Sequence, residues 1–116
     1  MTTTTATRAT TRAIPVVERT AGQTAAEQQL SDALTRVETA DRDAAVADAS
    51  RDELLDRLRA GDTTVTAPHL AEADAACRRA ELLCAAARDQ VPIARDAIKT
   101  ADMNAAIAEA SAKVQR

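Results

Sequence analysis

The chain of 116 residues contains no phenylalanine, tyrosine or tryptophan. Leu, Ile and Val together supply only nineteen residues, whereas Ala alone supplies thirty. A globular core draws much of its buried area from aromatic and branched aliphatic side chains. A chain so poor in them cannot fill a thick core. We therefore expect a thin one, such as the seam between two helices.

Long hydrophobic runs are missing as well. No apolar stretch approaches the roughly 20 residues that span a bilayer, and the N-terminal region lacks the apolar segment of a secretory signal. Cys77 and Cys84 are seven residues apart on a predicted helix, which is about 10 Å along its axis and too far for a disulfide between them. We therefore expect a protein of the cytoplasm, or one assembled there, with no membrane partner.

A strong excess of one charge is also absent. The formal net charge is −3, although 28% of the residues are charged. Low aliphatic content indicates disorder only when it is combined with a high net charge. Ala, Glu, Lys, Leu and Arg make up about half of the chain, a composition typical of long helices and coiled coils. We therefore predict an all-α protein.

Residues 1–22 form a Thr-rich segment that we predict to be an extended arm. Threonine is β-branched and a poor helix former, and Pro15 restricts Ile14 to extended geometry. Three arginines against one glutamate make this segment net positive, whereas the rest of the chain is net negative. The arm is therefore a candidate for contact with a partner.

Residues 23–116 are predicted to form a helical hairpin. The first helix is expected over 23–60, because Thr20 and Thr24 each begin a capping-box pattern and Gly61 is suited to the left-handed position after a helix. A turn follows over 61–66.

The second helix is expected over 67–91, with Thr66 as its N-cap. Pro92 should kink the helix or break it briefly. Helical patterning then resumes over 93–115.

Apolar residues recur in alternating steps of four and three through both predicted helices, which is the pattern of a coiled-coil seam. When the chain is folded about residue 64, the two stripes stay in register. The larger residues then meet near both ends and alanines meet in the middle. This pattern predicts an antiparallel, coiled-coil-like hairpin whose seam contains Leu30, Val37, Ala44, Leu54, Leu58, Leu70, Cys77, Cys84, Val91 and Ile98.

An alanine seam is thin. Burial of a Leu, Ile or Val side chain contributes roughly 1.5–3 kcal/mol and burial of an alanine much less, so a lone hairpin should be only marginally stable. Large apolar residues remain outside the seam, Leu55 among them, and we expect them to be exposed. The candidates for partner binding are Arg8, Arg12, Ile14, Val16 and Val17 in the arm, and Leu82, Leu83, Met103, Ile107 and Val114 in the second helix.

Catalytic and metal-binding patterns are not apparent. His69 is the only histidine, and no nucleophile or carboxylate is spaced to form a triad with it. Neither CxxC nor HxxxH is present for zinc, and no glycine-rich loop is present for phosphate. We therefore expect no enzyme activity, no cofactor and no small-molecule substrate. Three arginines without aromatic platforms also argue against nucleic-acid binding.

The segment LRAGDTTVTAPHLAEADAACRRAELL and the overall composition resemble the small Ala- and Arg-rich helical proteins encoded among the structural genes of tailed phages of actinobacteria. This resemblance implies a non-enzymatic role in the virion, as a capsid-associated, decoration or scaffolding-type component. The expected partner is a capsid or other assembly lattice, or further copies of the chain.

Two alternatives remain open. The length and predicted topology are similar to those of the Trp-x-Gly family of secreted helical hairpins, but the predicted turn reads RAGD and contains no tryptophan. A small regulatory or antitoxin-like module that binds through the arm is the other alternative.

Overall fold

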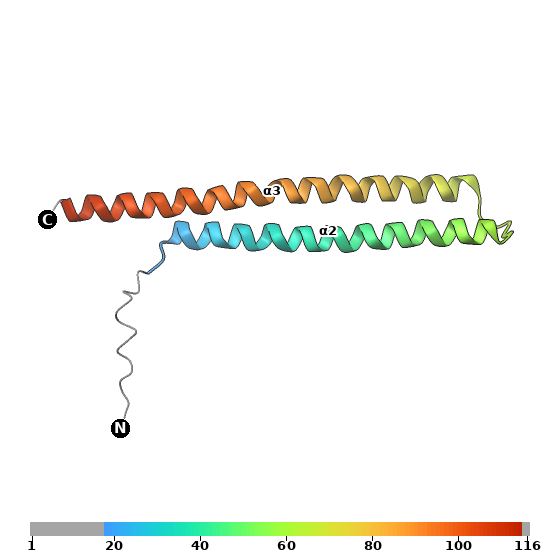
Figure 1. Ribbon diagram of the computed structural model, residues 1–116, viewed down its shortest axis with the longest axis horizontal. Coiled ribbons are helices and arrows are strands. Elements are labelled where there is room, and N and C mark those ends of the chain that lie inside the picture. The colour runs from blue at the N-terminus through green and yellow to red at the C-terminus, as the bar shows by residue number, and fades with distance from the viewer. Residues whose placement is uncertain (1–17, 115–116) are drawn as a thin grey trace, which may run out of the picture.

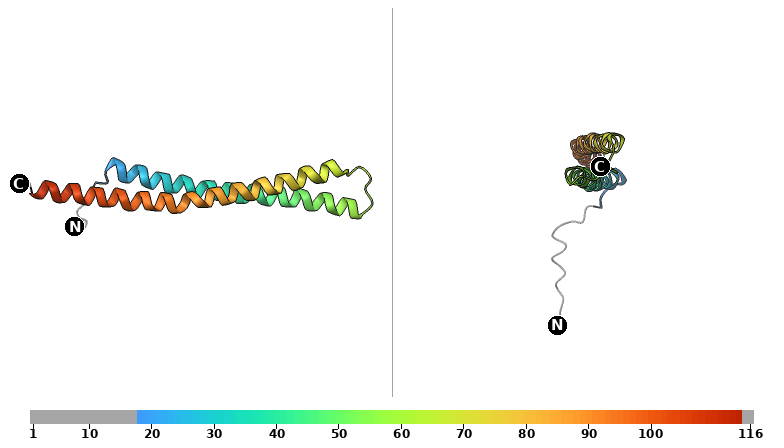
Figure 2. Two further views of the ribbon diagram at one scale, coloured as in Figure 1. Left: turned by 90° about the horizontal axis from the view of Figure 1, so that it is seen from above. Right: turned by 90° about the vertical axis from the view of Figure 1, so that its right-hand side faces the viewer.

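The computed structural model describes residues 18–114, which form two long α-helices joined by a short turn (Figure 1). Helix α2 spans Ala21–Arg59 and helix α3 spans Ala67–Val114. The helices lie side by side and run antiparallel, and the two views of Figure 2 show that they wind gently around each other. The predicted all-α helical hairpin is confirmed.

Helix α2 begins with a complete capping box at Thr20. The Thr20 hydroxyl accepts a hydrogen bond from the Gln23 backbone, and the Gln23 side chain accepts one from the Thr20 backbone. These two bonds satisfy backbone donors that a helix start leaves free. The helix therefore includes Ala21 and Gly22, which the sequence had placed in the arm.

The turn between the helices begins with a Schellman motif. Gly61 has a φ of 91°, a left-handed conformation that side chains other than glycine rarely adopt. Its N–H donates to the Leu58 carbonyl, and the N–H of Asp62 donates to the Arg57 carbonyl. These bonds satisfy the last carbonyls of α2, so the helix ends here.

Helix α3 begins with a reciprocal cap in which histidine takes the place of glutamate. The His69 backbone donates to the Thr66 hydroxyl, and the Thr66 backbone donates to Nδ1 of His69 at 3.2 Å. The single histidine is thus committed to a helix N-terminus. Val65 just before this cap is buried and closes the end of the hairpin.

Helix α3 continues through Pro92 without a break. A proline inside a helix removes one backbone hydrogen bond, because it has no N–H to offer to the carbonyl of Arg88 four residues earlier. Pro92 is exposed, so water can solvate that carbonyl. Of the two outcomes expected at this position, a kink or a break, the break does not occur.

The seam between the helices follows the heptad positions closely. The buried residues within the helices are all small: Ala26, Ala33, Cys77, Ala80, Cys84 and Ala94. The other predicted seam residues, apart from Leu58, are half-buried: Leu30, Val37, Ala44, Leu54, Leu70, Val91 and Ile98. Small residues in the middle allow the helix axes to approach closely.

The turn end departs from the heptad pattern. Leu58, expected in the seam, is 43% exposed, whereas Leu55, expected outside it, is half-buried. Leu58 lies in the last turn of α2, where the connection to α3 begins. Val65 is buried at this end, although the heptad pattern does not include it.

Candidate functional site

The two long faces of the hairpin have different chemistry. In α3, one flank of the seam carries charged residues and the other carries mostly small or apolar ones, whereas both flanks of α2 carry some charged residues. We call the first flank the charged face and the second the groove face. The contrast follows from heptad position, since residues seven apart in a coiled coil lie on the same side of the helix.

The charged face holds the hydrogen bonds and ion pairs that join the two helices within residues 18–114. Arg88 of α3 donates to the Asp41 carboxylate of α2 at 2.7 Å. Gln23 donates to Asp102 at 2.9 Å, and Arg19 lies 3.6 Å from the same carboxylate. The midpoint in sequence between the two partners of each helix-to-helix pair, Asp41 with Arg88 and Gln23 with Asp102, lies close to residue 64. The pairs therefore agree with the register deduced from the heptads.

Both cysteines are buried in the seam toward the charged face and are free thiols. Burial raises the pKa of the Cys77 thiol, and its hydrogen bond to Asp48 raises it further. Burial likewise raises the pKa of the Cys84 thiol, with an added hydrogen bond to Asp41. A buried thiol with a raised pKa is a poor nucleophile, so these residues act as small core residues.

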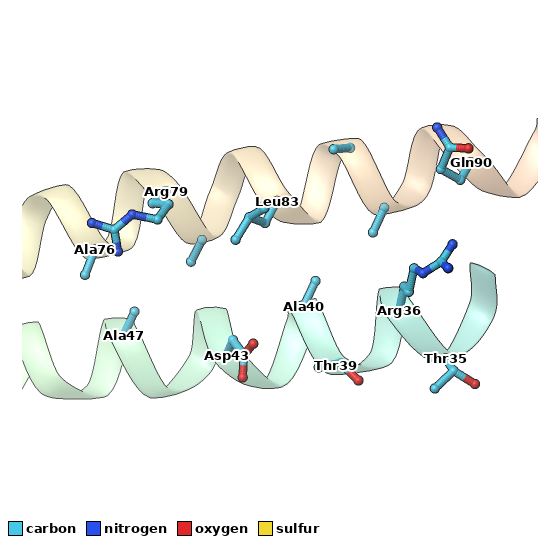
Figure 3. Close-up of a pocket in the computed structure, with 13 residues that line it drawn as sticks. Thr35, Arg36, Thr39, Ala40, Asp43, Ala47, Ala76, Arg79, Leu83 and Gln90 are labelled. Atoms are coloured by element: carbon cyan, nitrogen blue, oxygen red, sulfur yellow. The ribbon is translucent and has the colours of Figure 1, made fainter. Parts of the chain in front are cut away.

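The groove face contains an open, mostly apolar groove between the middles of the two helices. Figure 3 shows Leu83 of α3 directed toward α2, where Ala40 and Ala47 point back toward α3. Leu83 is 57% exposed. We define the central groove by its apolar floor and wall, which consist of Ala40, Ala47, Ala76, Ala80, Leu83, Ala86 and Ala87.

Charged and polar side chains line the two long edges of this groove, which we call its lips. Arg36 and Asp43 rise from α2, and Arg79 and Gln90 rise from α3 (Figure 3). Arg36 and Asp43 are exposed, and neither takes part in an ion pair within the described part of the chain. The groove therefore has an apolar floor and unpaired charges of both signs on its α2 edge.

Smaller hollows continue the groove toward both ends of α2. One lies between Ser50 and His69 near the turn, and the other lies between Gln29 and Ala97 near the start of α2. The α2 residues on this edge recur every seven positions, as Gly22, Gln29, Arg36, Asp43, Ser50 and Arg57. The groove face thus extends over the whole length of α2.

Helix α3 extends past the start of α2, so its last turns have no helix beside them (Figures 1 and 2). Thr20 and Gly22 reach only as far as Asn104, Ala105 and Ala108. Ile107 lies at this level and Val114 lies beyond it, and both are exposed, Val114 to 84%. Together with Met103 and Ala110 they form an apolar stripe near the end of α3.

The predicted partner-binding residues fall into three groups. Leu83 lies in the central groove, whereas Leu82 is exposed on α3 outside it. Met103, Ile107 and Val114 lie on the apolar stripe near the end of α3. The structure does not bring these groups together into one surface. The arm residues Arg8, Arg12, Ile14, Val16 and Val17 lie outside the described residues.

The sequence reasoning missed the groove. The heptad pattern also places Ala40, Ala47, Ala80 and Ala87 between the helices, and the structure shows that they form the groove floor as well. A signal was present in the heptad positions that flank the seam. On one flank α3 carries Asp74, Glu81, Arg88, Arg95 and Asp102, and on the other it carries Ala76, Leu83, Gln90 and Ala97.

Within residues 18–114 no cluster of three or more potential metal ligands occurs. In the same region, neither helix has an apolar stretch long enough to cross a membrane. Comparisons with known protein families, with characterised proteins and with solved structures found no match for this chain. Functional inference therefore depends on the surfaces described above.

Proposed function

We propose that this chain is a non-enzymatic structural protein that binds a larger protein assembly through the apolar stripe on α3. The observation that carries this proposal is the exposed apolar stripe at the end of α3, where Ile107 lies level with the start of α2 and Val114 lies beyond it. Exposed apolar side chains grouped along one helix are typical of protein-binding surfaces. A helix laid in a groove of its partner would bury residues spaced as Met103, Ile107, Ala110 and Val114 are.

The energetics of the hairpin support the same function. Its core is a single seam whose buried residues are alanines, cysteines and one valine. Ordering each backbone residue costs about 1–2 kcal/mol, so a seam of small side chains leaves little net stability. Binding to a partner would bury the large apolar residues that the fold leaves outside and would stabilise the rod by mass action.

The assembly that we propose is a virion lattice, with the chain as a capsid-associated, decoration or scaffolding-type component. The resemblance to small structural proteins of tailed phages supports this partner. The positively charged, Thr-rich segment before α2, which the sequence predicts to be extended, is a suitable second contact, since an extended arm can lie across a neighbouring subunit.

Cosedimentation of the purified chain with assembled capsid shells of its source tests the proposal. Ile107→Asp places a charge in the stripe, whereas Ala106→Asp places the same charge on the neighbouring exposed position outside it. We expect the first variant to lose most of its binding and the second to retain it. Equal binding by both variants, or no binding by the unmodified chain, would show that the stripe does not contact the shell.

A further inference from the structure

The central groove lies apart from the overhang and calls for a different partner. We infer that the groove face binds a second copy of this chain, and that the two hairpins pack antiparallel as a four-helix bundle with their turns at opposite ends. The geometry of the groove face provides four separate reasons. This inference does not depend on the overhang or on a virion partner.

The first reason is symmetry. A pair of identical chains related by a two-fold axis must place a point of the groove opposite itself. The middle residue of α2, which spans Ala21–Arg59, is Ala40, and Ala40 lies on the groove floor. With an axis at this level, α2 of one copy packs along the full length of α2 of the second copy. No other level gives complete overlap.

The second reason is charge complementarity on the lip. Arg36 and Asp43 are two helical turns apart on the same edge of α2, and Ala40 lies between them. Reversing the helix direction about Ala40 brings Arg36 of each copy opposite Ala44 of the other, next to Asp43 on the same groove edge. The two unpaired charges of each copy would thus form two identical ion pairs across the interface, one on each side of the axis.

The other charged residues near the lip oppose no like charges in this arrangement. Reversal about Ala40 places Asp32 level with Ala47 and Asp48 of the second copy, and Glu53 level with Ala26 and Glu27. Asp48 and Glu27 lie on the charged face, so these carboxylates do not meet. On α3, Arg79 would face the region of Ile93. The charged face does not have this property, because carboxylates such as Asp41, Asp48, Asp74 and Glu81 crowd it.

The third reason is the size of the residues at the proposed axis. Ala40 on α2 and Ala86 and Ala87 on α3 lie at this level of the groove. Alanines let facing helices approach closely, as the seam already shows. Leu83, which is largely exposed in the single hairpin, would then fit beside Gln90 and Ile93 of the second copy.

The fourth reason is area. Helix α2 has 39 residues and is therefore about 60 Å long at 1.5 Å per residue. Two helices packed about 8–10 Å apart present a strip roughly 15 Å wide. The strip offers on the order of 800 Å² from each copy, which is the area of a standard stable interface.

Sedimentation equilibrium of the full chain over a range of concentrations tests the inference. We expect a dimer of twice the 12.2 kDa chain mass. Arg36→Asp and Asp43→Arg should each weaken the dimer by roughly tenfold or more, because each places like charges in contact. The double variant R36D/D43R should return the dissociation constant to near its original value, since both ion pairs are restored with their signs exchanged.

Three outcomes of this experiment are informative. Recovery in the double variant supports the antiparallel pairing and separates a lost interface from misfolding, because a misfolded chain would not be rescued by a second charge reversal. A dimer that resists both single variants, or that the double variant fails to restore, overturns the pairing. A chain that stays at 12.2 kDa at every concentration overturns self-association altogether.

Two controls complete the design. Asp52→Arg makes the same charge change as Asp43→Arg on the other flank of α2 and should leave the dimer intact. Ile107→Asp should also leave it intact, because Ile107 is not among the residues that line the groove face. Loss of shell binding without loss of the dimer, or the reverse, therefore shows which of the two proposals has failed.

Discussion

The carboxylate of Asp41 accepts a hydrogen bond from the guanidinium of Arg88 at 2.7 Å, and the two residues are 47 positions apart in the chain. This contact joins the middles of α2 and α3. Both side chains are about half exposed, and exposed ion pairs contribute about 0–1 kcal/mol. The pair is therefore consistent with the register of the hairpin but supplies little of its stability.

Arg88→Ala should accordingly lower the free energy of unfolding by less than about 1 kcal/mol. Urea denaturation followed by far-UV circular dichroism measures this change. Arg95→Ala is the matched control, because Arg95 occupies the equivalent position one heptad later and has no ion pair within the described residues. A loss of several kcal/mol for Arg88→Ala alone would show that the pair, rather than the seam, dominates.

Ala94→Leu should destabilise the hairpin even though it adds apolar surface. Ala94 is fully buried, with 0% of its surface exposed. A larger side chain there must push the helices apart or adopt a strained rotamer, at a cost of about 1–3 kcal/mol. The same denaturation assay applies, with Ala85→Leu as the control because Ala85 is exposed. Equal stability of the two variants would mean that the seam is loosely packed.

Pro92→Ala should stabilise the chain. The substitution restores the hydrogen bond from residue 92 to the carbonyl of Arg88 and removes the clash of the proline ring with the preceding turn, which together cost up to about 3 kcal/mol. The position is exposed, so no packing is lost. A rise in melting temperature is expected by circular dichroism. Pro68→Ala should change little, because a proline in the first turn displaces no helical bond.

Asp62 should make the turn sensitive to acid. Hydrogen bonds from the Thr64 hydroxyl and backbone, followed by one from Arg57, lower the pKa of the Asp62 carboxyl to about 2. Because the folded pKa is depressed, this contribution is fully present above the unfolded pKa near 4. It is lost as the pH falls from about 4 toward 2.

Asp62→Asn removes the titrating group and tests this prediction. Melting temperatures measured between pH 6 and pH 2 should fall for both proteins, since other carboxylates also titrate, but the drop below pH 4 should be smaller for the variant. Parallel curves for the two proteins would show that the turn is not stabilised by ionised Asp62.

The architecture was predictable because it depends on local patterns. The heptad stripes, the capping box at Thr20 and the glycine at position 61 each specify geometry within a few residues of themselves. Where the fold deviates, a neighbour from elsewhere decides. At the turn end, Val65 from the connection is buried while Leu58 stays partly exposed, and Pro92 was tolerated because it faces solvent.

The groove was harder to predict from the sequence, because a heptad pattern identifies which residues lie between two helices and not which side of the pair stays open. Ala40 and Ala87 count equally as seam and as groove floor until the flanking residues are compared. That comparison, between Leu83 on one side and Arg88 on the other, needs the orientation of both helices at once. The arm candidates from Arg8 to Val17 remain predictions.

The placement of Gly61 halfway along the helical part of the chain has a consequence for how the molecule closes. Contacts nearest this glycine link residues that are close in sequence, whereas Gln23 and Asp102 are 79 positions apart. Closing a short loop has a lower entropic cost than closing a long one. The two helices are therefore expected to begin pairing next to the Schellman motif and to continue pairing toward the far end of the hairpin. The end of the hairpin that carries the apolar stripe would then pair last during folding and separate first during unfolding. The segment that we propose to bind a partner is therefore the one whose helices separate most easily.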